Sequence, residues 1–110
     1  MYLYVELWNP KPSWLGLSAE DRHMFMGKVD KFLQGLGPEY TISGTCINDG
    51  DTTPRAGYSF AVVWMLNDKS QVKSVANGTA AVGWYEYFDQ VNVGGDCQTP
   101  DQLVTAMIEL

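Results

Sequence analysis

Segments whose hydrophobic residues recur every second position alternate along the chain with segments of helical spacing. This pattern constrains the fold more than any other feature. Residues 2–8 alternate with a period of two, which predicts a strand with two different faces. One face carries Leu3, Val5 and Leu7, and the other carries Tyr2, Tyr4, Glu6 and Trp8. Helical spacing then predicts a helix over residues 19–36, which Gly37 and Pro38 end. We expect the aliphatic set of the strand to lie under helices.

Later segments continue this alternation of strand and helix. Residues 40–47 and 58–66 have strand character, and the turn-forming residues 48–55 separate them. Asp68 is suited to cap a second helix that Gly83 ends, and residues 87–93 return to strand character. Gly94 and Gly95 are expected to break that strand, and residues 99–108 predict a terminal helix. Residues 9–16, with two prolines and a glycine, predict a loop.

Length and charge limit the possible classes of protein. The chain has 110 residues, which predicts one domain spanning residues 1–110. A net charge of -6 argues against nucleic acid as a partner, because that binding needs clustered Lys and Arg. No apolar run is long enough to span a membrane, and Met1 leads directly into the first strand, so we expect a cytoplasmic protein.

The cysteines and the histidine argue against a metal centre. Cys46 and Cys97 are far apart in sequence and form no C-x-x-C pair, so we expect two reduced thiols. His23 is the single histidine, which leaves too few ligands for a typical buried zinc or di-iron site. No metal and no cofactor are therefore expected, although haem would need only one axial ligand, and His23 leaves that alternative open.

The order strand, helix, strand, strand, helix, strand predicts an α+β domain with the ferredoxin-like βαββαβ fold. Right-handed crossovers place both helices on one face of an antiparallel four-stranded sheet of order 4-1-3-2. This order puts Cys46 and Cys97 on opposite edges. The uncovered face would carry Tyr2, Tyr4 and Trp8, and an open aromatic face of that size predicts a homodimer.

Three segments carry a resemblance to a known group of proteins. They are residues 2–8, the loop Pro12-Ser13-Trp14-Leu15, and above all residues 83–92, with the sequence GWYEYFDQVN. Together they resemble an uncharacterised bacterial family within the dimeric α+β barrel superfamily. The resemblance covers most of the chain and implies a homodimer. It does not imply one activity, since that superfamily includes cofactor-free monooxygenases, isomerases, lactonising enzymes, haem enzymes and proteins with no known reaction.

Glu6 and His23 are the candidate catalytic residues. Glu6 lies in mid-strand between Tyr4 and Trp8, where partial desolvation would raise its pKa and suit a general base. The alternative, which we weight more heavily, is a structural pair with a basic residue or a tyrosine hydroxyl across the dimer. His23 has a suitable intrinsic pKa, but lies about 200° around the helix from Phe25, which favours an exposed position.

Aromatic residues predict a ligand pocket between the sheet and the helices. The second helix offers small residues, including Ala76, Thr79 and Ala80, where a packed helix would offer Leu or Phe. The ligand-binding candidates are Trp8, Trp14, Trp64, Tyr85, Tyr87 and Asp89. We expect Trp14 and His23 at one side of the polar end and Tyr85 and Asp89 at the other, and Gln90 and Asn92 on the sheet face away from the helices. Phe60, Val62 and Trp64 form the apolar wall if that set of the third strand faces inward, although the other set is almost equally apolar.

Two classes of function remain open. The first is a cofactor-independent enzyme, similar to a monooxygenase, isomerase or cyclase, in which Glu6 or His23 moves a proton of a small apolar or aromatic metabolite. The second is a non-catalytic ligand-binding or accessory homodimer. A deep pocket that holds an ionisable group of shifted pKa favours the first, and a cavity filled by side chains favours the second.

Overall fold

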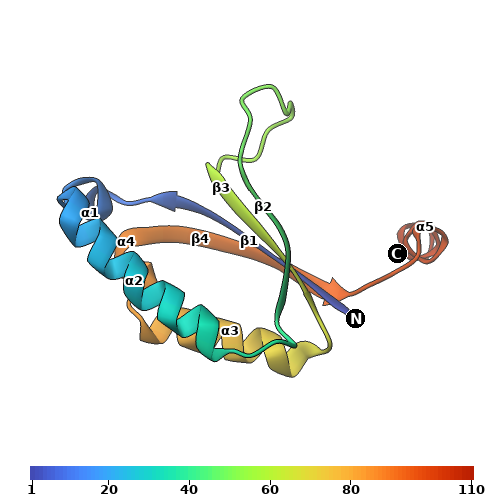
Figure 1. The fold of residues 1–110 in the computed structure, drawn as a ribbon. Coiled ribbons are helices and arrows are strands. Elements are labelled where there is room, and N and C mark those ends of the chain that lie inside the picture. The colour runs from blue at the N-terminus through green and yellow to red at the C-terminus, as the bar shows by residue number, and fades with distance from the viewer.

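A computed structural model describes all residues from Met1 to Leu110. One four-stranded sheet forms its centre, with two main helices across one face (Figure 1). The strands are β1 (Tyr2–Pro10), β2 (Thr41–Ile47), β3 (Phe60–Leu66) and β4 (Phe88–Asp96). The helices are α1 (Pro12–Leu15), α2 (Ala19–Gly35), α3 (Lys69–Ala81), α4 (Trp84–Tyr87) and α5 (Pro100–Ile108).

The sheet has the strand order that the sequence predicts. β1 lies between β3 and β4 and pairs antiparallel with both, while β2 pairs with β3 at the far edge. The resulting order β2-β3-β1-β4 is 4-1-3-2 when counted from the other edge. The fold is therefore ferredoxin-like, as predicted. Cys46 in β2 and Cys97 after β4 are free and exposed, and they lie at opposite edges of the sheet, as the predicted strand order requires.

The prediction of which face of β1 meets the helices was wrong. Tyr4 and Glu6 are buried under α2 and α3, whereas Leu3 on the other face is exposed. The β1–β3 register places Tyr4 beside Trp64 and Glu6 beside Val62, so one inward-facing set continues across both strands. Large rings fill the space above the sheet because α3 contributes mainly small side chains there. The principal core consists of Tyr4, Val62, Trp64, Leu66 and Val75.

The opposite face of the sheet carries no helix and is aliphatic instead of aromatic (Figure 1). The register assigns to it Leu3, Val5, Leu7, Ala61, Val63, Met65, Val91 and Val93. Leu3, Val91 and Val93 remain 37%, 42% and 62% exposed. This open aliphatic face replaces the predicted surface of Tyr2, Tyr4 and Trp8 as the apolar surface that lacks a partner.

The ends of the main helices agree with the sequence signals. The Ser18 side chain accepts from the backbone N–H of Asp21 at 3.1 Å and so caps α2, which ends within one residue of the prediction. Asp68 caps α3 by accepting from the N–H groups of Ser70 and Gln71. Gly83 has a φ of 86°, a left-handed conformation that lets the chain turn from α3 into α4.

Two segments differ from their prediction. Residues 9–16 continue β1 through Pro10 and then form the short helix α1, instead of a loop. β4 does not break at Gly94 and Gly95 but continues to Asp96. A side chain on Gly94 would meet the rings of Tyr2 and Tyr4 at 3.2 and 3.5 Å. Gly94 thus leaves space for two tyrosines of the neighbouring strand and does not end its own.

The terminal helix α5 forms where the sequence predicts it. Thr99 and Gln102 form a reciprocal capping box at its first turn. The helix stands apart from the sheet, and none of its residues is buried (Figure 1). Its apolar side chains Leu103, Val104, Met107 and Ile108 are all exposed. No helix in the chain has the length and apolar character needed to cross a lipid bilayer.

Candidate functional site

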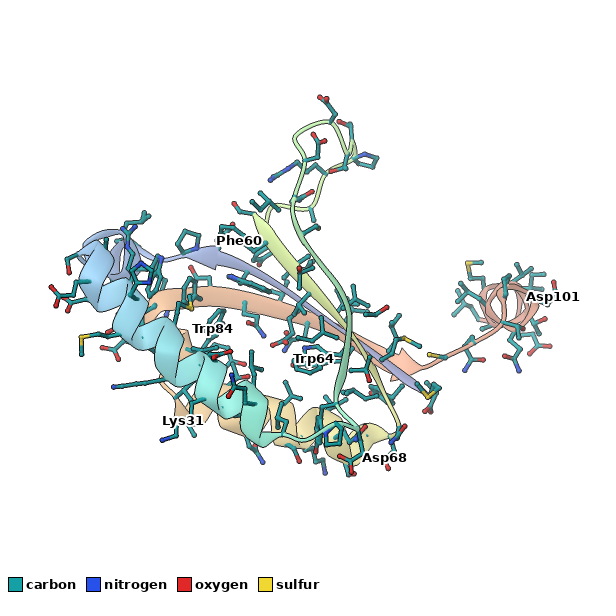
Figure 2. All side chains as sticks on the ribbon, viewed as in Figure 1. Lys31, Phe60, Trp64, Asp68, Trp84 and Asp101 are labelled. Atoms are coloured by element: carbon teal, nitrogen blue, oxygen red, sulfur yellow. The ribbon has the colours of Figure 1, made fainter.

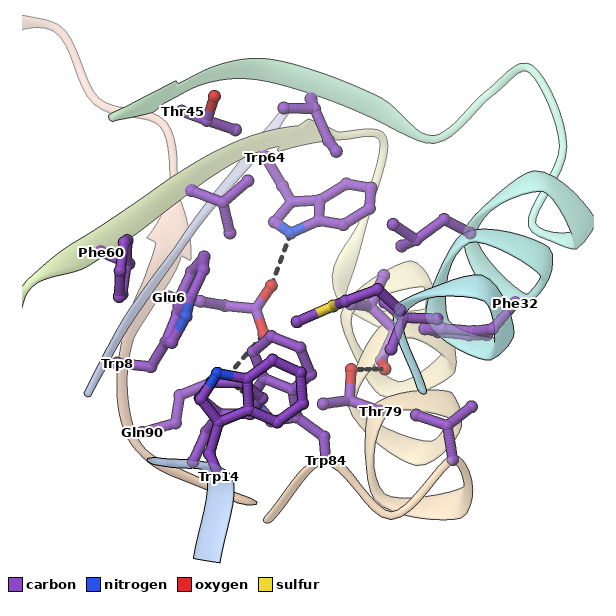
Figure 3. A pocket seen from close by; sticks show the side chains of 18 residues that line it. Glu6, Trp8, Trp14, Phe32, Thr45, Phe60, Trp64, Thr79, Trp84 and Gln90 are labelled. Atoms are coloured by element: carbon purple, nitrogen blue, oxygen red, sulfur yellow. Dashed lines mark hydrogen bonds between the residues drawn. The ribbon is translucent and has the colours of Figure 1, made fainter. Parts of the chain in front are cut away.

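A cavity of about 380 Å³ lies between the sheet and helices α2 and α3 (Figure 3). Fourteen of its 18 lining residues are hydrophobic, and the other four are Glu6, Thr45, Thr79 and Gln90. Figure 2 shows Trp64 and Trp84 in the space between the sheet and the helices. This size and this mostly apolar lining are typical of a pocket for a small molecule.

Glu6 is the polar centre of the cavity. It is only 6% exposed, and its two carboxylate oxygens accept hydrogen bonds from different side chains. The indole Nε1 of Trp64 donates to Oε1 at 2.7 Å, and Nε2 of Gln90 donates to Oε2 at 2.6 Å. The sheet brings Glu6, Trp64 and Gln90 together. Val62 in β3 and Asn92 in β4 lie opposite Glu6 in β1, and Trp64 and Gln90 are the next residues on the same face of those two strands.

A second tryptophan fixes the orientation of the Gln90 amide. The indole Nε1 of Trp84 donates to Oε1 of Gln90 at 2.8 Å, so the amide nitrogen must face Glu6. That nitrogen also donates to Oδ1 of Asn92 at 2.9 Å. Both neighbours of Glu6 are therefore donors, and neither offers an acceptor to a protonated carboxyl. A proton on Glu6 has to point toward the cavity.

Burial raises the pKa of Glu6, and the hydrogen bonds from Trp64 and Gln90 oppose part of this effect because they stabilise the anion. Burial also raises the pKa of Tyr4, and the nearby charge of Glu6 raises it further. The same two causes raise the pKa of Tyr85. The two phenols consequently stay protonated at neutral pH.

Aromatic rings form the walls on either side of Glu6. Trp8 packs edge-on against Trp84 with ring centroids 5.5 Å apart, and stacks on Phe60 at 5.9 Å. Trp84 stacks on Phe88 at 4.1 Å, and Trp14 contacts Phe88 at 4.8 Å. These contacts join β1, β3, β4, α1 and α4 into one aromatic wall.

Helix α1 holds Trp14 in this wall. The backbone N–H of Lys11 donates to the carbonyl of Tyr87 at 2.8 Å, and the Ser13 hydroxyl donates to the carbonyl of Glu86 at 2.7 Å. Arg22 of α2 donates to the carbonyl of Trp14 at 3.2 Å and lies over its ring at 5.7 Å. The short helix is thus fixed to both α4 and α2.

Comparison with known proteins assigns the chain to a family. A family of unknown function, DUF6616, matches residues 1–110. The chain belongs to this family. No curated protein matches the sequence significantly.

Solved structures similar to this DUF6616 chain show the fold but share little sequence. A provisionally assigned chlorite dismutase, TA0507, has a TM-score of 0.65 and 14% identity over 80% of this chain, which spans only 38% of that protein. Arabidopsis thaliana At3g17210 has a TM-score of 0.58 and 13% identity, over 90% of this chain and 97% of its own. A Bacteroides fragilis protein, described as dimeric, ferredoxin-like and of unknown function, has a TM-score of 0.54 and 13% identity, with coverages of 87% and 95%.

The structure brings some of the candidate site residues to the cavity and leaves others outside. Glu6, Trp8, Trp14 and Trp64 line it, and so do Phe60 and Val62 of the expected apolar wall. His23 is exposed on α2, as its helical position favours, and does not line the cavity.

The expected polar end of the cavity was wrong. Tyr85 and Asp89 are exposed and do not line the cavity, and Asp89 instead pairs with Lys11 at 3.9 Å. Tyr87 packs against Trp14 and Phe25, also outside the cavity. Gln90 and Asn92 face the helix side of the sheet, contrary to expectation, because they share the face of Trp8 and Glu6. If the inward-facing residues of β1 had been assigned correctly, the sequence would have placed Gln90 on the same face as Glu6.

Several lining residues were not among the ligand-binding candidates. They are Met26, Val29, Phe32 and Leu33 from α2, with Trp84 from α4. Val29, Phe32 and Leu33 follow the helical spacing that predicts the helix, and a packed core and a cavity wall share that spacing. No sequence signal distinguishes a wall that packs on its neighbours from one that faces a space. No cluster of three or more His, Cys, Asp or Glu side chains is placed to hold a metal ion.

Proposed function

We propose that the cavity binds a small, largely apolar metabolite and that Glu6 exchanges a proton with it, without a cofactor. The observation that carries this proposal is that Glu6, which is only 6% exposed, lines a mostly apolar cavity of about 380 Å³. A general base works best when its pKa lies near the working pH, and burial moves the pKa of Glu6 in that direction. Isomerisation, cyclisation and cofactor-free oxygenation all begin with such a proton transfer.

The aromatic wall suits the same role. Rings held by mutual packing and by α1 provide a surface that needs no reorganisation when a ligand enters. Trp64 and Gln90 hold the carboxylate in one orientation, which fixes its position against a bound ligand.

One observation favours the second candidate, a non-catalytic binding protein. Both oxygens of Glu6 already accept hydrogen bonds from the protein, so the carboxylate also joins β1, β3 and β4. If Glu6 has only this structural role, the protein binds a ligand in the cavity, but Glu6 exchanges no proton with it.

We also propose that the protein is a cytoplasmic homodimer joined through the open aliphatic face. The Bacteroides fragilis protein with this fold is described as dimeric. Two such faces packed about a two-fold axis would bury Val91 and Val93, which a single copy leaves exposed. Two exposed free thiols are compatible with a reducing compartment. The cavity lies on the other side of the sheet, so each protomer would keep its own site.

A bicyclic ketone, 2-tetralone, tests binding and proton transfer together. We expect wild-type protein to bind it and to accelerate the exchange of its α-hydrogens with deuterium, followed by NMR. Thr79→Leu should abolish both, because Thr79 lines the cavity and the larger side chain fills it. The free energy of unfolding should change by less than about 1.5 kcal/mol, since the added atoms occupy space.

Two further variants separate the candidate functions. Ala80→Leu is the matched control, because Ala80 is the exposed neighbour of Thr79 and does not line the cavity; it should keep binding and exchange. Glu6→Gln should bind the ketone without accelerating exchange. If wild type binds but never accelerates exchange, the non-catalytic function holds. Unchanged binding in Thr79→Leu would place the ligand elsewhere.

A further inference from the structure

The cavity has an unbalanced charge. Of its 18 lining residues, Glu6 alone can carry a charge, and no Lys, Arg or His is among them. The single ion pair of the protein joins Lys11 to Asp89, and Asp89 lies outside the cavity. An ionised Glu6 is therefore a buried anion for which the protein supplies no cation.

The hydrogen bonds to Glu6 stabilise the anion but do not neutralise it. Trp64 has one indole N–H, and it is used. The amide nitrogen of Gln90 divides its two hydrogens between Glu6 and Asn92. A buried charge without a counter-charge is costly, so an ionised Glu6 is stabilised when a molecule in the cavity supplies a positive charge.

The walls around this anion favour a cation. Four tryptophans line the cavity, and indole faces attract cations more strongly than other aromatic side chains do. Figure 3 shows the rings of Trp8, Trp14 and Trp84 around the carboxylate of Glu6. A cation there would meet the negative charge of an ionised Glu6 beside several indole rings. An anionic ligand would meet repulsion from the same charge.

We propose that the metabolite carries a protonated amine, and that this ammonium group lies against Glu6 between the indole rings. This inference rests on the proposed function, because it uses the same cavity and the same carboxylate. The ammonium keeps its proton and remains a cation, so the ion pair with Glu6 supplies the counter-charge that the protein lacks.

Three probes with one carbon skeleton test the charge preference. They are 2-aminotetralin, which is cationic at pH about 7, the neutral 2-tetralol, and tetralin-2-carboxylate, with amine and carboxyl pKa values in the ordinary range. Calorimetry on wild-type protein should give the amine at least about tenfold tighter binding than the alcohol, and no binding of the carboxylate. This ranking needs no variant, so it does not depend on a mutant folding.

Removing the carboxylates of Glu6 and Asp89 one at a time shows which of them causes the preference for the amine. Glu6→Gln should weaken binding of the amine by about tenfold or more and change binding of the alcohol by less than about twofold. Asp89→Asn is the matched control, because it removes one negative charge outside the cavity, and it should leave both affinities unchanged. In ¹⁵N NMR spectra, the amine should shift the indole N–H signal of Trp64, which binds Glu6 directly.

The outcomes distinguish this inference from the proposed function. If 2-tetralol binds as tightly as the amine, or if the carboxylate binds, the charge preference is overturned while a neutral metabolite remains compatible with the cavity. If Glu6→Gln keeps the preference for the amine, the cation does not lie at Glu6. If neither the three probes nor 2-tetralone binds, the proposed function fails together with the inference.

Discussion

Gly78 determines how closely the two main helices approach each other. An added Cβ at Gly78 would lie 1.9 Å from Cε1 of Phe32, which is closer than two non-bonded carbon atoms can approach. We expect Gly78→Ala to lower the free energy of unfolding by about 1–3 kcal/mol, because overpacking outweighs the better helix propensity of alanine. Urea denaturation measures this change. Phe32 also lines the cavity, so a displaced ring should weaken binding of 2-tetralone as well.

Gly27 provides the matched control within α2. Nothing lies within 4 Å of a Cβ added there, so Gly27→Ala should raise the free energy of unfolding by about 0.5–1 kcal/mol through helix propensity alone. Equal effects from the two substitutions would show that α2 and α3 do not meet at Gly78.

Glu6 makes stability depend on pH in a direction opposite to that of most carboxylates. Its pKa in the folded protein is raised above the ordinary 4.5, so the folded state holds the proton more tightly than the unfolded state does. Its contribution to stability is therefore complete below pH 4.5 and is lost as the pH rises through the folded pKa. The cause is the burial of an anion at 6% exposure.

We expect this loss to appear as a difference between wild type and Glu6→Gln. Over the pH window above 4.5, wild-type stability should fall relative to the variant by up to about 1.4 kcal/mol per pH unit. Other carboxylates cancel in the difference, and a constant offset from the altered hydrogen bonds does not affect the slope. Parallel urea denaturation series at several pH values measure it. A flat difference would mean that Glu6 is no harder to ionise in the folded protein.

At the scale of elements, the sequence predicts well which helices and strands form and in what order they follow one another. Ser18 and Asp68 satisfy backbone N–H groups that any helix start must satisfy, so their local chemistry marks the helix starts. Gly83 likewise supplies a turn that needs positive φ. These signals act within a few residues, and the predicted fold follows from them through the crossover rule.

The facing of the strands could not be predicted because it is not a local property. A period of two separates Tyr4 and Glu6 from Leu3 and Val5 but does not say which set meets the helices. Aliphatic residues were assigned inward on general preference. The outcome depends on α3, which presents the small side chains Val75 and Thr79 to the sheet and so leaves room for the larger aromatic set. One wrong choice of face then misplaced Gln90 and the open apolar face of the sheet together.

At the scale of the whole molecule, one protomer buries little of itself. Only 10 of 110 residues are buried, and the uncovered side of the sheet is aliphatic across three strands. Val91 and Val93 both have exposed side chains on this face of β4. The cavity and this face lie on opposite sides of the sheet, so assembly and ligand binding are separable by substitution.

We therefore expect a dimer in light scattering at micromolar concentration, and a monomer after Val93→Glu. Val93 is 62% exposed in one copy, so the charge should be tolerated by the fold but not by an apolar interface. The monomeric variant should still bind 2-tetralone, because its cavity is unchanged.

Met24→Glu is the matched control for this experiment. Met24 is 64% exposed on α2, away from the sheet, so the same charge placed there should leave the dimer intact. Dissociation by both substitutions would point to general repulsion in a chain whose net charge is already -6. A dimer that survives Val93→Glu would require another interface, and the exposed Leu103, Val104, Met107 and Ile108 of α5 are the remaining apolar surface large enough to test by the same substitution.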